Sequence, residues 1–165
     1  RALGFTALTY GLLLTVFGLA SLVGAFLAPR LSARLGPGRA IILARSAYPL
    51  VWLAILLAPD TPLGSVLLFA ALALQGLAMG SENTPEQYLW QTLTPDEILG
   101  RSNATRRAGN RTLTAAGALL AGLSVGIVGE RPALIPVVLL FAIAALIAWL
   151  SPLRHTLDDP ADGDA

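Results

Sequence analysis

Two glutamates inside a long apolar run are the residues of this sequence best suited to chemistry. Glu82 and Glu86 lie in the second half of a hydrophobic stretch over residues 63–93, together with Gln75 and Asn83. The spacing of Gln75, Glu82 and Glu86 is i, i+7 and i+11, which places the three on one stripe of a helix. A charge at the middle of a bilayer costs about 2.5–3.5 kcal/mol, so such residues usually face an interior cavity. The pattern predicts a polar cavity lined by this stripe, with Asn83 as a further candidate.

Two interpretations of these acids stay open. Glu82 could carry a proton or balance the charge of a cationic substrate, or either glutamate could pair with an arginine. Three arginines lie at a depth in the bilayer from which they could reach the glutamates: Arg45, Arg107 and Arg111. Arg111 is a candidate partner inside the cavity. For Glu86 the pairing is favoured, because Glu86 lies about 6 Å nearer the arginine-rich end of the helix. For Glu82 neither interpretation is favoured.

The elements that must position these residues are five apolar stretches. Each is long enough to cross about 30 Å of hydrocarbon and too long for a strand. The sequence therefore predicts an all-α fold, a polytopic membrane helical bundle over residues 1–154, followed by an acidic tail over residues 155–165. The predicted spans are 9–28, 40–58, 63–93, 107–128 and 133–150.

The composition excludes several classes of protein. Hydrophobic residues make up 55% of the chain and charged residues 13%, whereas a soluble domain carries about 25% charged residues. A soluble enzyme, a nucleic-acid binder and a disordered chain are therefore disfavoured. The chain has no cysteine and one histidine, His155, so we expect no metal site and no cofactor.

The arginines are distributed unevenly between the two faces of the predicted bundle. Two, Arg1 and Arg131, fall on one face, and nine fall on the other: Arg30, Arg34, Arg39, Arg45, Arg101, Arg106, Arg107, Arg111 and Arg154. The positive-inside bias assigns the arginine-rich face to the cytoplasm. We therefore expect a multi-pass protein of the plasma (inner) membrane whose chain starts outside, crosses five times and ends in the cytoplasm. An outside start predicts a missing upstream membrane segment.

Small residues are spaced for close contact between helices, which lipid does not otherwise drive. Two faces are predicted to pack in this way, as part of the bundle or, alternatively, as the seam of a homodimer. The residues concerned are Gly11, Gly18 and Ala25 in the first span, and Ala118, Gly122 and Gly126 in the fourth.

Two loops carry a resemblance to a known family. The first, over residues 24–39, has a small-residue helix end, basic residues and a tight glycine turn, and it resembles the cytoplasmic loop signature of the major facilitator superfamily. The second, over residues 91–106, is similar to the P-(D/E)-x-x-x-G-R segment before the penultimate helix of drug- and siderophore-exporter-like members. The matching residues are Arg30, Arg34, Gly36 and Arg39 in the first loop, and Pro95, Gly100 and Arg101 in the second.

The resemblance covers about residues 5–154 and implies that the five spans correspond to the last five of a twelve-span transporter. Two six-helix bundles of such a fold rock about a site near the bilayer midplane. The missing N-terminal half of the same chain would then be a partner of this part.

These observations lead to an expected function. The chain is expected to be part of a secondary active transporter, an antiporter that exports a small molecule in exchange for protons, with no nucleic-acid partner. One alternative is a non-transporting scaffold or regulatory subunit, which would not need buried acids. A less favoured alternative is an intramembrane enzyme, which would need a nucleophile–base pair or a metal site. No predicted span contains histidine or cysteine, so we assign no catalytic residue.

Overall fold

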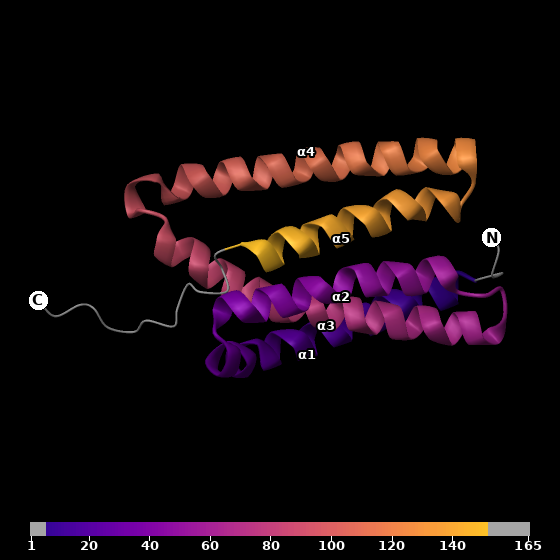
Figure 1. Ribbon diagram of the computed structural model, residues 1–165, viewed down its shortest axis with the longest axis horizontal. Helices are drawn as coiled ribbons and strands as arrows, with labels where there is room; N and C mark the ends of the chain where they lie inside the picture. The colour runs from indigo at the N-terminus through magenta and orange to yellow at the C-terminus, as the bar shows by residue number, and fades with distance from the viewer. Residues whose placement is uncertain (1–5, 152–165) are drawn as a thin grey trace, which may run out of the picture.

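The computed structural model describes residues 6–151, which form five long helices joined by short turns (Figure 1). All five are long and apolar enough to cross a membrane. The predicted all-α bundle with five membrane helices is thus confirmed. The predicted acidic tail, Arg1 and Arg154 lie outside the described residues. The helices are α1 (Ala7–Leu35), α2 (Pro37–Leu57), α3 (Pro62–Leu93), α4 (Asp96–Val128) and α5 (Ile135–Leu150), and the short 3-10 helix η1 (Pro132–Leu134) precedes α5.

Local sequence signals explain where these helices begin and end. The side chain of Thr6 accepts a hydrogen bond from the backbone N–H of Thr9 and caps the start of α1. Gly36 has a φ of 82°, which favours glycine, and it ends α1 directly before Pro37 opens α2. Gly129, with a φ of 88°, ends α4 in the same way.

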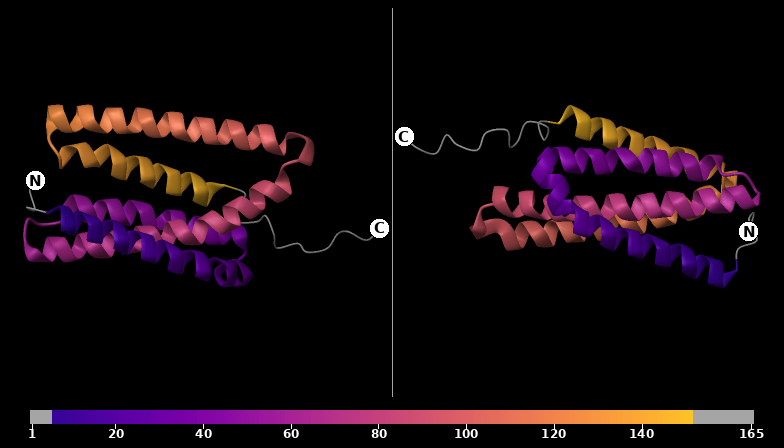
Figure 2. Two further views of the ribbon diagram at one scale, coloured as in Figure 1. Left: turned by 180° about the vertical axis from the view of Figure 1, so that it is seen from behind. Right: turned by 90° about the horizontal axis from the view of Figure 1, so that it is seen from below.

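Two helices extend beyond their predicted spans, and two contain an interior proline. α1 continues past residue 28 through Pro29, and α4 starts at Asp96, before the predicted 107, and runs through Gly100. α3 runs through Pro85, inside its predicted span. A proline inside a helix removes one hydrogen bond and bends the helix without necessarily ending it. The last turns of α1 accordingly turn away from the line of its first part (Figure 2, right). An interior glycine costs only about 1 kcal/mol, which the long helical flanks of Gly100 offset.

The core lies between α1, α2 and α3, and α5 rests against α2 (Figure 1). α1 and α3 approach most closely, because glycines on both helices leave no side chain between the backbones. A Cβ atom on Gly24 would strike the carbonyl of Leu77, and one on Gly80 would strike the carbonyl of Ser21. Gly76 makes the same kind of approach to α1.

The glycines of the predicted small-residue faces make no such contact within the described chain, and the alternative of a homodimer seam stays a prediction. A Cβ atom on Gly11 or Gly18 would meet no other atom within 4 Å, and the same holds for Gly122 and Gly126. α4 contains no buried residue along its whole length. The residues that form the close contact lie elsewhere because the rotation of each helix, which periodicity leaves open, is set by the partner it packs against.

The ends of the bundle differ in charge. The connections at Gly36 and at residues 94–95 lie at one end, and those at 58–61 and 129–131 lie at the other (Figure 1). At the second end Arg131 donates hydrogen bonds to the carbonyl of Ala58 and to the carboxylate of Asp60, each at 3.0 Å. The two arginine-rich connections thus share one end of the bundle.

Candidate functional site

The two glutamates of α3 face α2 and share one arginine. Nε of Arg45 lies 3.6 Å from Oε2 of Glu82, and a terminal nitrogen of Arg45 lies 3.6 Å from Oε2 of Glu86. Glu82 and Glu86 are four residues apart, one turn of α3, so a single guanidinium on α2 reaches both carboxylates. The structure therefore combines the two predicted acids into one site with Arg45.

Glu86 is the more firmly paired acid. Arg106, near the start of α4, donates a hydrogen bond of 3.1 Å to Oε1 of Glu86, while Arg45 approaches the other carboxylate oxygen. The guanidinium of Arg106 also lies over the ring of Trp90, 5.0 Å from its centroid. A charge-assisted hydrogen bond together with a cation–π contact fixes this arginine. The position of Glu86 is thus that of a structural ion pair between α3 and α4.

Glu82 is held more loosely although it is more buried. Its side chain is 13% exposed, against 35% for Glu86. Among residues 6–151, Oε2 of Glu82 is a buried atom without a hydrogen bond, because 3.6 Å to Arg45 exceeds hydrogen-bond length. The hydroxyl of Tyr48 on α2 faces the same carboxylate. Glu82 is therefore a desolvated acid with spare capacity to bind a proton or a cation.

A hollow of about 290 Å³ opens beside this site at the arginine-rich end. Arg45 and Glu86 form its polar wall, and Leu89, Trp90 and Ile41 contribute apolar surface. Such a mixture of apolar walls and a few placed charges is typical of sites for small ligands.

Other predicted site residues are not brought to the glutamates. Gln75 is half-buried about two turns away from Glu82 on α3, and Asn83 is exposed. Arg111 and Arg107 are exposed on α4, and none of the four ion pairs that join described residues includes either. The arginine that reaches Glu86 from α4 is Arg106, which the sequence analysis did not choose.

The residues of the two loops occupy the arginine-rich end without forming one cluster. Gly36 makes the α1–α2 turn, and Pro95 directly precedes α4. Gly100 and Arg101 are exposed in the first turns of α4. Arg30 and Arg34 line a separate hollow between α1 and α3.

Two side chains of the site were not predicted as site residues. Arg106 directly precedes Arg107 in the sequence, and the rotation of α4 brings Arg106, not Arg107, to Glu86. Tyr48 is three residues from Arg45 and four from Trp52, so the sequence places the three on one face of α2, but it does not show that this face meets Glu82. Tyr48 also contacts Phe141, with ring centroids 5.4 Å apart, so α5 supports the tyrosine from behind.

Residues 6–151 contain no group of three or more histidine, cysteine, aspartate or glutamate side chains that could hold a metal ion.

Comparison with known proteins agrees with the fold and the charge pattern. The model of the Major Facilitator Superfamily matches residues 1–164. No curated protein and no solved structure matches the chain. The family match extends over nearly all of the chain and includes all five membrane helices and the ion-pair site. The chain therefore belongs to the Major Facilitator Superfamily of secondary transporters, and it is a multi-pass membrane protein.

Proposed function

We propose that this chain is the C-terminal part of a proton-coupled exporter of a small molecule, related to the drug- and siderophore-exporter branch of the superfamily. The observation that supports this most is the buried oxygen of Glu82 that lacks a hydrogen bond while its neighbour Glu86 is fully paired. An acid kept desolvated and loosely held is suited to exchanging a proton, whereas a firmly paired acid is not.

The arrangement of charges suggests how Glu82 couples protons to substrate. Arg45 lies at the same distance from both acids, so it can stay with Glu86 when Glu82 takes up a proton. Protonation of Glu82 then leaves the cluster with one uncompensated positive charge, and deprotonation restores neutrality. A cationic substrate would favour the deprotonated form, and a proton would displace it, which is the alternation that exchange requires.

The proposed orientation places the arginine-rich end and the C-terminus in the cytoplasm of a cell with a plasma (inner) membrane. The bilayer and the N-terminal spans of the same chain are the remaining partners. A reporter fused after Arg154 should be cytoplasmic, and one inserted at Asp60 should lie outside. The reverse locations would overturn this orientation.

The decisive variant is Glu82→Gln in the complete transporter, which removes the proton site and keeps the shape of the side chain. We expect inside-out vesicles with an acidic interior to accumulate the cationic dye ethidium when they contain the unchanged protein. The variant should lose this pH-driven accumulation and still exchange ethidium between the two sides at equal pH. Accumulation at the unchanged rate would refute the role of Glu82.

A further inference from the structure

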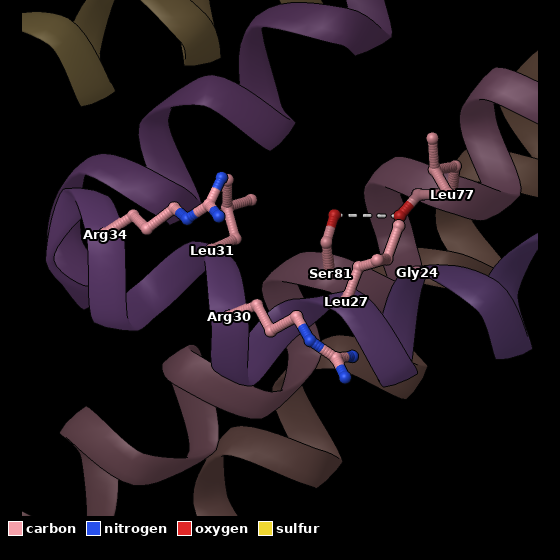
Figure 3. A pocket seen from close by; sticks show the side chains of 7 residues that line it. All are labelled: Gly24, Leu27, Arg30, Leu31, Arg34, Leu77 and Ser81. Atoms are coloured by element: carbon pink, nitrogen blue, oxygen red, sulfur yellow. Dashed lines mark hydrogen bonds between the residues drawn. The ribbon is translucent and has the colours of Figure 1, made fainter.

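A second hollow, between α1 and α3, is similar in size to the first and differs from it in charge. It has a volume of about 280 Å³ and is lined by residues of α1 and α3 near the arginine-rich end (Figure 3). Leu27, Leu31 and Leu77 form its apolar walls, and Gly24 lets α1 and α3 meet at its floor. Arg30 and Arg34 complete the lining, and their guanidinium groups extend in different directions in this view (Figure 3).

The arginines of this hollow are not neutralised within the described chain. The hollow beside Glu86 contains an arginine and its own acid, whereas no acidic residue lines this one. Among residues 6–151 neither Arg30 nor Arg34 has an ion pair or a side-chain hydrogen bond. The remaining polar group, the hydroxyl of Ser81, donates to the carbonyls of Leu77 and Ala78 at 2.8 and 3.0 Å, so it needs no other partner. Two unpaired cations beside an apolar surface call for a ligand that is both anionic and apolar.

We propose that this hollow binds one anionic phospholipid of the bilayer. Arg30 and Arg34 stand four residues apart, about 6 Å along α1, so their long, flexible side chains can turn toward the oxygens of one phosphodiester group. Arginine matches phosphate with a planar pair of donors, which a lysine does not offer. The acyl chains would cover Leu27, Leu31 and Leu77. Basic hollows between membrane helices at the cytoplasmic side are suited to such headgroups.

The binding is measured by native mass spectrometry of the complete transporter with equal amounts of dioleoyl phosphatidylglycerol and dioleoyl phosphatidylcholine. We expect phosphatidylglycerol to bind at least about tenfold more tightly, because only it carries a net negative charge to the arginine pair. The double variant Arg30→Gln, Arg34→Gln should remove this preference. The matched control is Arg107→Gln with Arg111→Gln, which has the same charge change and helical spacing on α4, a helix without a buried residue, and it should keep the preference within about twofold.

A third variant, Leu27→Trp, tests the apolar half of the site. It fills the hollow and keeps both arginines, so the preference for phosphatidylglycerol should fall about as far as in the arginine variant. It also decides the question if the double arginine variant does not fold. The proposal would be overturned by an unchanged preference in either the arginine or the tryptophan variant. An equal loss in the Arg107 and Arg111 control, or full competition by millimolar inorganic phosphate, would overturn it too.

Discussion

Replacing Gly80 by alanine should weaken the contact that holds α1 against α3. A Cβ atom at this position would strike the carbonyl oxygen of Ser21 and would lie 2.8 Å from the backbone nitrogen of Ala25. Both atoms belong to the backbone of α1, so no flexible side chain can move aside. The two helices must separate by more than about 0.6 Å, because that shift brings only the contact with Ala25 to an ordinary 3.4 Å and the contact with Ser21 is closer still.

The cost of this separation can be estimated. A gap of about 0.5–1 Å forfeits roughly a quarter to a half of the dispersion energy of each contact that it opens. Overpacking of this kind typically costs about 1–3 kcal/mol. Alanine recovers about 0.5–1 kcal/mol, because it loses less conformational freedom in a helix than glycine. We therefore expect Gly80→Ala to lower the free energy of unfolding by about 1–2 kcal/mol.

Gly18→Ala is the matched control, since it introduces the same atom into α1 where nothing lies within 4 Å. It should be neutral or raise the free energy of unfolding by up to about 1 kcal/mol. The measurement is equilibrium unfolding of the complete transporter in mixed micelles of dodecyl maltoside and dodecyl sulfate, followed by circular dichroism. Equal effects of the two substitutions would refute the close approach of α1 and α3.

Two further predictions concern contacts between helices. A double-mutant cycle on Glu86 and Arg106, measured by unfolding, should give a coupling energy of about 1–2 kcal/mol, because the pair is partly buried and hydrogen-bonded. The same cycle on Asp60 and Arg131, both more than half exposed, should give less than about 0.5 kcal/mol. Equal coupling energies for the two pairs would contradict this difference in burial. Trp149→Phe removes the hydrogen bond of 2.8 Å that joins α5 to α2, so the free energy of unfolding should fall by about 1 kcal/mol, and no change would show that this bond contributes nothing.

Hydropathy was sufficient to predict the membrane helices, and depth made Arg45 one of three candidate partners of the acids. A long apolar segment is stable across a lipid bilayer as a helix, and the depth of each residue in the bilayer follows from its distance to the helix end. Glu82 and Glu86 could therefore be matched to an arginine on a neighbouring helix by depth alone. The depth of a residue in the bilayer does not give the rotation of its helix about the helix axis. This explains why Arg106 reaches Glu86, where Arg107 and Arg111 were expected.

The glycine contact shows the same limit. Gly11 and Gly18 repeat every seven residues, which suggested a common face in contact with another helix. The contact instead uses Gly24 with Gly76 and Gly80. Gly76 and Gly80 form a G-x-x-x-G step, a known signal for close helix approach that the sequence analysis overlooked. Which of several small-residue faces becomes buried depends on the neighbouring helix, and a single sequence does not specify that neighbour.

Proton movement measured together with substrate movement tests the central proposal most directly. Vesicles containing the complete transporter and an internal pH-sensitive dye would receive ethidium on one side at equal pH. The account predicts that the unchanged protein moves protons in the direction opposite to ethidium, and that Glu82→Gln moves ethidium down its gradient with no proton movement. Glu86→Gln, which removes a paired acid, should retain proton movement in whatever fraction of the protein folds. Undiminished proton movement in Glu82→Gln would contradict the assignment of coupling to this residue.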